Sequence, residues 1–202
     1  MRWDRFFEDL EDQLDSEWEA ERAALDTEAE RLRLSRIPLR DRLVALAGSG
    51  GRVPEITADL RDGTVLAGAV TRVGADWMAL SVPGAGTAPV WLVPSEGIST
   101  LVLRAEDVLA TARDANPGGT LGQRMMFGFV LRDLVRRRIP VTVHLTSGRV
   151  LSGTIDRAGA DHLDIAVHEI GAVRRADQIT GYRLIPLGAV AAVRLDAVVD
   201  LI

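Results

Sequence analysis

The feature that most constrains the fold of this chain is a gapless internal repeat. The segment G-A-D-W-M-A-L-S-V at Gly74–Val82 returns, 85 positions later, as G-A-D-H-L-D-I-A-V at Gly159–Val167. The match extends upstream in the same register, where Leu60 and Gly63 meet an identical Leu145 and Gly148. Because self-similarity at a fixed spacing is the mark of repeated structural units, we expect two superposable copies of one unit.

Each copy reads as a helix followed by about five short strands. Runs rich in Val, Leu and Thr are separated by glycine turns at Gly63 and Gly148, which is the pattern of antiparallel hairpins. Gly68 and Gly153 fall inside strands, where a glycine marks a sharp bend that passes close to another backbone. We therefore predict an α+β, mainly β fold with two small antiparallel five-stranded barrels, each preceded by a helix.

The first 34 residues predict one long helix with a narrow apolar stripe. Residues 1–30 hold 12 acidic side chains against three arginines, and neither Gly nor Pro interrupts them. Pro38 ends the pattern, because proline lacks the amide proton that a helix interior needs. Such a narrow stripe favours pairing with a second copy of the helix, the alternative being an arm folded over the chain's own barrels. The residues predicted to hold copies together are Trp3, Phe7, Leu10, Leu14 and Trp18.

These patterns divide the chain into four parts. We expect an N-terminal helical or coiled-coil arm over 1–48 and a first barrel over 49–104. A helical connector over 105–139 then leads to a second barrel over 140–202. Since each barrel would be too small to be very stable alone, we also expect the two to pack together.

The spacing apolar-x-apolar-x-Leu-x-x-Gly-x-x-x-x-Gly-x-apolar, followed by an Asp and an apolar pair, resembles the Sm-like (LSm) family and its SH3/Sm-like barrels. The resemblance covers about Leu39–Leu103 and Leu121–Leu195. The tandem arrangement and the use of arginine without lysine are also similar to actinobacterial proteins. In RNA-binding members of the family an asparagine contacts the base, and Ala79 and Asp164 stand at that position here.

The residues available for catalysis are few. The chain contains no cysteine and no lysine, so thiolate metal sites, cysteine nucleophiles and Schiff-base chemistry are excluded. Of the three histidines, His144 and His162 could lie on neighbouring strands near Asp161 and Asp164, which is the one candidate for a metal or acid–base site. We predict a protein that is not an enzyme and that carries no cofactor and no metal.

Two functions remain open from the sequence. The first is an RNA-associated or regulatory Sm-like module, and the second is an oligomeric protein–protein scaffold that binds no nucleic acid. The run at 136–138 could equally be a solvated helix end, where cations complement the helix dipole. The residues predicted to contact RNA phosphates and bases are Arg136, Arg137, Arg138, Arg174, Arg175, Trp77 and His162.

The partners and location follow from the same sequence. We expect a homo-oligomer held by the N-terminal helix, with RNA and proteins as candidate partners and no association with a membrane. The start M-R-W-D-R-F-F-E-D-L-E-D is acidic where a signal peptide would be basic and then apolar, so we expect a cytoplasmic protein.

Overall fold

The computed structural model describes residues 2–48, 54–84, 88–112, 119–169 and 178–195; within the first helix, side chains are described at 18, at 19 and from 21 onward. The chain divides into two compact units, Met1–Pro38 and Leu39–Ile202. We describe each unit by itself.

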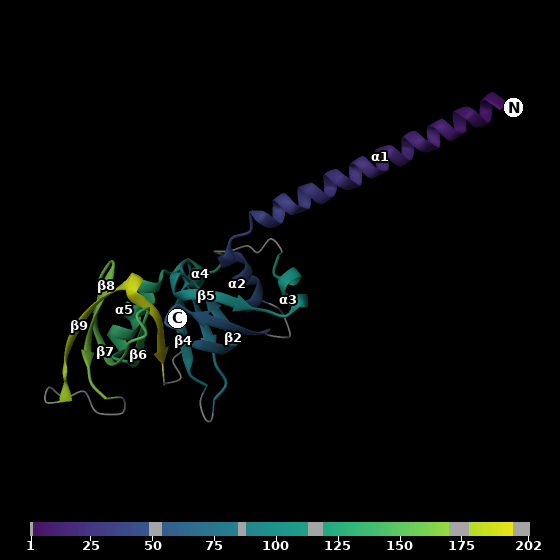
Figure 1. The fold of residues 1–202 in the computed structure, drawn as a ribbon. Helices are drawn as coiled ribbons and strands as arrows, with labels where there is room; N and C mark the ends of the chain where they lie inside the picture. The colour runs from purple at the N-terminus through teal and green to yellow at the C-terminus, as the bar shows by residue number, and fades with distance from the viewer. Residues whose placement is uncertain (1, 49–53, 85–87, 113–118, 170–177, 196–202) are drawn as a thin grey trace. The chain divides into compact units, whose positions relative to one another are not determined.

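The first unit consists of α1 (Arg2–Ser35), drawn in Figure 1 as one uninterrupted helix. Its apolar side chains recur at seven-residue intervals, and Trp18, Leu25 and Leu32 are all exposed. The predicted contact residues Trp3, Phe7, Leu10 and Leu14 lie outside the described side chains. No helix in the described residues is long and apolar enough to cross a membrane.

The second unit begins with α2 (Leu39–Ala47), directly after Pro38, which suits the entry to a helix. The first set of strands is β1 (Glu55–Leu60), β2 (Val65–Val73), β3 (Trp77–Ser81), β4 (Val90–Pro94) and β5 (Ile98–Val102). Three short helices follow, α3 (Ala105–Ala110), α4 (Leu121–Arg124) and α5 (Phe127–Arg137). The second set is β6 (Pro140–Leu145), β7 (Val150–Ala158), β8 (His162–Val167), β9 (Gly181–Pro186) and β10 (Val190–Leu195).

All ten strands belong to one antiparallel sheet, in the order β5-β1-β2-β3-β4-β10-β6-β7-β8-β9. The predicted class, α+β with mainly β-structure, is confirmed. The sequence predicts two five-stranded barrels; in the structure the two sets of strands pair into one sheet, because β10 pairs with β4 on one side and with β6 on the other. We call β1–β5 with α2 the first half, and β6–β10 with α5 the second half.

Within the sheet, the two halves share strand order and register. Glu55 of β1 faces Ala69 of β2, and Pro140 of β6 faces Thr154 of β7, which are the same positions 85 residues on. The pairing of the next two strands shifts between Val70 and Arg72 in one half and between Ile155 and Arg157 in the other. The gapless alignment of the two sequence copies is therefore also an alignment of their strands. Both copies share an irregularity that adds one residue to β2 in the first half and to β7 in the second half.

The glycines repeated inside the strands sit where a side chain has no room. A Cβ added to Gly68 would collide with the carbonyl oxygen of Ser81, and one added to Gly153 would collide with that of Ala166. At the hairpin turns, Gly63 and Gly148 have φ angles of 86° and 80°, in the region that favours glycine. The predicted roles of the turn glycines and of the strand glycines are both confirmed.

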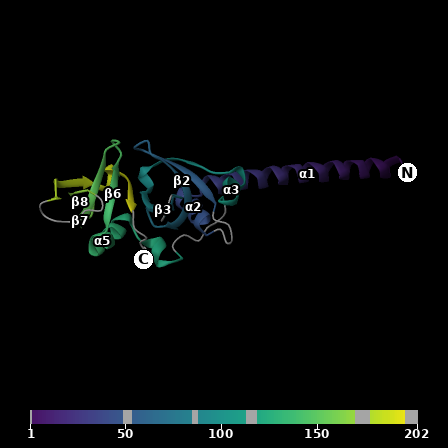
Figure 2. The same cartoon turned by 90° about the horizontal axis from the view of Figure 1, so that it is seen from below.

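Two apolar cores lie on the sheet, one under α2 and one under α5. Leu43 and Leu46 of α2 pack with strands of the first half, and α2 contacts β2. Leu131 and Leu134 of α5 pack with strands of the second half, and α5 contacts β7 (Figure 2). The second core also takes in Trp77, Ala79 and Leu92 from β3 and β4 of the first half. Consequently β3 and β4 have both faces buried, one against each core.

Candidate functional site

The second-half helix docks on the loop that precedes β3. The backbone N–H of Phe127, at the start of α5, donates to Oδ1 of Asp76 over 2.7 Å. The backbone N–H of Ala75 and the indole Nε1 of Trp77 both donate to the carbonyl oxygen of Met125, over 2.9 Å each. Trp77 is only 2 % exposed. Its ring, which the sequence suggested as a platform for a nucleic-acid base, is instead part of the contact between the halves.

His162 occupies the corresponding place in the second half, at the start of β8. Its Nδ1 lies 2.8 Å from Oδ1 of the neighbouring Asp161, and its side chain is 42 % exposed. The hydrogen bond from His162 holds the pKa of the Asp161 carboxyl below its usual value. Among the described residues, no helix donates a backbone N–H to the Asp161 side chain as α5 does to Asp76, and the Asp161 side chain is exposed. This loop is therefore open to solvent.

The other histidines lie elsewhere. His144 of β6 is paired with Asp62 in the first hairpin turn, and His168 bonds the buried hydroxyl of Thr154 through Nε2 over 2.8 Å. β6 and β8 are separated in the sheet by β7, so His144 and His162 are not on neighbouring strands. The described residues contain no group of three or more His, Cys, Asp or Glu placed to hold a metal ion.

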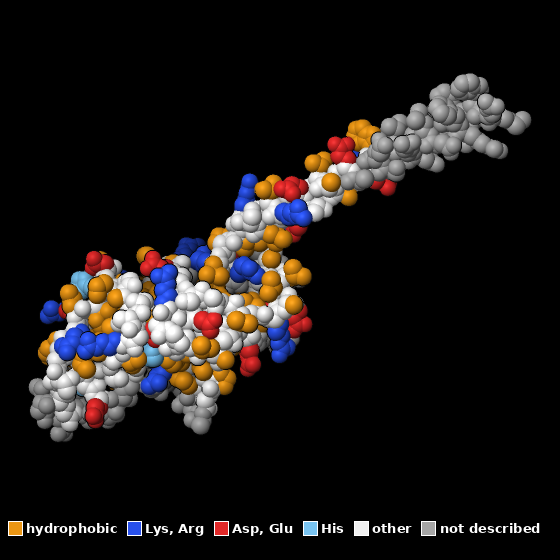
Figure 3. Space-filling model, in the orientation of Figure 1, with side chains coloured by type: hydrophobic (Ala, Val, Ile, Leu, Met, Phe, Trp, Pro, Cys, Tyr) orange, Lys and Arg blue, Asp and Glu red, His pale blue; other side chains and the backbone are white. Residues whose placement is uncertain are grey.

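The predicted phosphate-binding arginines are partly engaged within the protein. Arg136 and Arg137, at the end of α5, both form ion pairs with the buried carboxylate of Asp133. Arg138 follows in the left-handed conformation, with φ 52° and ψ 42°, and is exposed. Arg174 and Arg175 lie outside the described residues. On the face drawn in Figure 3, arginines are interspersed with carboxylates and apolar side chains and form no single basic patch.

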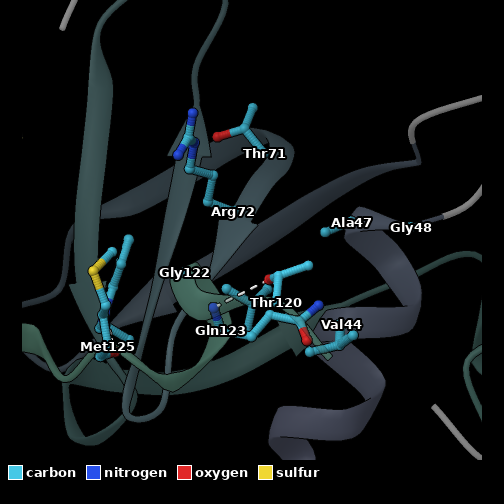
Figure 4. Close-up of a pocket in the computed structure, with 11 residues that line it drawn as sticks. Val44, Ala47, Gly48, Thr71, Arg72, Thr120, Gly122, Gln123 and Met125 are labelled. Carbon is cyan, nitrogen blue, oxygen red and sulfur yellow. Dashed lines mark hydrogen bonds between the residues drawn. The ribbon is translucent and has the colours of Figure 1, made fainter. Parts of the chain in front are cut away.

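A hollow of about 300 Å³ lies between α2, the irregular part of β2 and α4. Figure 4 shows Val44 and Ala47 of α2 on one side of the hollow and Arg72 on the strand. Arg40 of α2 fixes its walls, because its guanidinium donates from Nε to the carbonyl oxygen of Gly74 over 2.9 Å and from Nη2 to that of Gln123 over 2.5 Å. The lining is mostly apolar, with no cluster of acid and base groups.

A second hollow, of about 310 Å³, lies at the matching irregularity of β7. Arg138, Arg157 and Asp156 are among the residues that line it. Arginine forks bind phosphate and carboxylate groups well, so this hollow is a candidate anion site.

The end strand β9 of the sheet is the remaining candidate site. Leu92 of β4 and Leu184 of β9 hold matching positions, opposite Ala79 and Asp164 on the neighbouring strand. Leu92 is 0 % exposed and Leu184 is 69 % exposed. Leu92 packs in the second core, whereas Leu184 lies on the strand that ends the sheet and belongs to neither core. Tyr182, also on β9, is exposed as well.

Sequence reasoning did not identify these edge residues, although the signal was present. Leu92-Val93-Pro94 and Leu184-Ile185-Pro186 are the same motif in the two copies. The motif predicts two equivalent strands, but it does not tell which of them finds a neighbour.

The chain matches no protein-family model. It also has no significant match to a curated protein sequence.

Proposed function

We propose that this chain is a non-enzymatic tandem Sm-like protein that serves as an oligomeric protein–protein scaffold. The observation that carries the proposal is the exposure of Leu184 at a position where its counterpart Leu92 is fully buried. A strand edge with unpaired backbone groups and apolar side chains is a ready template for another strand. The end strand β9 therefore has the form of a docking edge.

The long first helix supports the same function. Trp18, Leu25 and Leu32 present an apolar line along the described part of α1, and each is at least half exposed. Large apolar side chains repeated at seven-residue intervals are typical of helices that pair. Acidic residues 1–30 and the arginines that follow would attract one another in an antiparallel pair. Together α1 and the sheet edge give the scaffold two separate means of association.

RNA association is the second candidate, and the hollow with Arg138 and Arg157 favours it. Three of the predicted contacts are less available, since Trp77 is buried and Arg136 and Arg137 are paired with Asp133. We therefore place the scaffold first.

Two measurements on the full-length protein separate these functions. Light scattering at tens of micromolar should report a mass above that of one 21.9 kDa chain, and a monomer would contradict the scaffold. Titration of a mixed RNA pool at two salt concentrations should show no binding that salt weakens. Salt-dependent RNA binding, lost in Arg138→Ala with Arg157→Ala, would favour the second candidate instead.

A further inference from the structure

The hollow of about 300 Å³ between α2, β2 and α4 is built from segments that lie far apart in the sequence. Val44 and Ala47 of α2 form one side of it (Figure 4). Val73 lines it at the end of β2, and Met125 lines it directly after α4. The hollow therefore brings residues of the first half together with the connector that leads to α5.

Hydrogen bonds within the protein hold these walls in place. The Arg40 guanidinium donates both to the carbonyl oxygen of Gly74 and to that of Gln123. The indole Nε1 of Trp77, which itself lines the hollow, donates to the carbonyl oxygen of Met125. Small-molecule sites are usually largely formed before the ligand arrives. These bonds give the hollow that property, since none of them involves a ligand.

The size and the apolar lining of the hollow suit a small apolar ligand body. The side chains of Val44, Ala47, Val73 and Met125 are all aliphatic. The volume corresponds to about ten water molecules at their share of liquid volume, and hence to a ligand of about ten non-hydrogen atoms. The hollow is thus at the lower end of the range for small-molecule sites.

The charge of the lining suits an anionic head on this ligand. Among the described residues that line the hollow, Arg72 is the only charged one. Arg72 is exposed, and its guanidinium makes no hydrogen bond or ion pair with another described residue. An arginine fork binds a carboxylate through two parallel N–H donors. The hydroxyl of Thr120, also in the lining, accepts the backbone N–H of Gln123, which leaves its own proton to donate.

We propose that this hollow binds a small amphiphilic monocarboxylate. The apolar chain of the ligand lies against Val44, Val73 and Met125, and its carboxylate pairs with Arg72 at the rim. Such a ligand touches α2 and β2 as well as Met125, so it stabilises the attachment of the connector to the first half. The site is separate from α1 and from the edge of β9, the two means of association of the scaffold.

The second half supplies an internal comparison. Arg157 corresponds to Arg72, 85 positions later, and lines the hollow at the matching irregularity of β7. Among the described residues that line this second hollow, only Val135 and Ile155 are apolar, and Asp156 adds a negative charge. Arg157 therefore has the same side chain on the matching strand without the apolar chamber, which makes it a matched control.

Methionine-methyl NMR of the full-length protein locates the binding, with octanoate as the probe because it matches the size of the hollow. Met125 lines the hollow, the neighbouring Met126 is exposed outside it, and Met78 is buried in the first core. Octanoate should shift the Met125 signal until it saturates and should shift the other two little. Equal shifts of Met125 and Met126 would mean non-specific surface contact and would overturn the site.

Substitution of the two matching arginines tests the anionic head. Arg72→Ala should weaken octanoate binding roughly five-fold or more, because a hydrogen-bonded ion pair is lost. Arg157→Ala should leave the affinity unchanged. Circular dichroism of both variants should match the wild type, because both arginines are exposed. An equal loss of affinity in the two variants, or a loss in neither, overturns the pairing of the carboxylate with Arg72.

A ligand series on the wild type makes the test independent of how any variant folds. Octanol keeps the chain without the charge, octylamine reverses the charge, and both should bind more weakly than octanoate. Butanoate keeps the carboxylate and should also bind more weakly, because each methylene removed from water adds affinity. Octanol or octylamine binding as tightly as octanoate overturns the anionic head, and butanoate binding as tightly overturns the apolar chamber. The mass of the wild type tests the scaffold separately, so either proposal can fail alone.

Discussion

His144 of β6 places its Nδ1 3.1 Å from Oδ2 of Asp62, in the first hairpin turn. This pair connects the two halves of the sheet at a point separate from the β4–β10 contact. The His144 ring also lies 4.9 Å from the ring of Trp91, measured between centroids, and the guanidinium of Arg194 lies 5.9 Å from the Trp91 centroid. The side chains of Asp62 and His144 are 3 % and 12 % exposed, so the pair is largely shielded from water.

The Asp62–His144 pair should make stability fall in acid. Burial would raise the pKa of Asp62, but the Thr64 backbone N–H, the Thr64 hydroxyl and His144 together outweigh it and hold this pKa below its usual value. A carboxyl with a lowered folded-state pKa contributes stability above its unfolded pKa, about 3.9, and loses that stability as pH falls through the folded pKa. Asp62→Asn should therefore show a shallower loss of unfolding free energy below about pH 4.

Urea unfolding from pH 2 to pH 7 measures this slope. Asp26→Asn, which changes an exposed carboxylate on α1, is the control. An acid slope that is the same in Asp62→Asn and in the wild type would mean that the pair does not contribute.

Gly153 should tolerate no side chain. Gly153→Ala drives its Cβ into the carbonyl oxygen of Ala166, so we expect a loss of about 1–3 kcal/mol in unfolding free energy. Gly122→Ala, where a Cβ meets nothing within 4 Å, should change it by less than about 0.5 kcal/mol. Chemical denaturation of both variants decides the matter, and equal midpoints would show that the close approach at Gly153 is easily relieved.

Trp77→Phe should destabilise the contact between the halves. The substitution removes the indole N–H that donates to Met125 and leaves a gap in a buried site, at a cost of about 1–3 kcal/mol. Phe129→Leu, at an exposed position of α5, should be nearly silent. Thermal unfolding followed by circular dichroism compares the two. If both behave alike, Trp77 does not hold α5 against the first half.

Association through α1 should depend more on apolar contact than on charge. Leu25→Asp with Leu32→Asp should weaken it far more than added salt, because exposed ion pairs contribute only about 0.2–1 kcal/mol each. Sedimentation velocity of full-length protein at low and high salt is the measurement. Ala24→Asp, adjacent to Leu25 on the helix, serves as control. A mass that responds to salt but not to the leucines would make charge the dominant force.

The sequence predicted what depends on neighbours along the chain. Gly63 and Gly148 required positive φ, and Gly68 and Gly153 required space, because turn and bend geometry are local. The register of 85 residues also carried over from sequence to strands, since side-chain alternation fixes which face of each strand is buried.

The sequence could not show which strand edges of the two halves pair with each other. Trp77 looks exposed in a strand that starts after a turn, and only the docking of α5 buries it. Leu92 and Leu184 are the same residue in the same motif, so no local pattern separates the covered edge from the open one. The pairing of β10 with β4 joined the expected barrels into one sheet for the same reason.

The position of β10 in the sheet affects how the chain folds during translation. β10 is the last of the ten described strands to be synthesised, yet it lies between β4 and β6, near the middle of the sheet. The first half can form its own hairpins while translation continues, but the edge of β4 stays uncovered until Val190–Leu195 has emerged. Contacts between residues so far apart in sequence form slowly. During that interval the edge of β4 in the nascent chain is open to mispairing with neighbouring nascent chains.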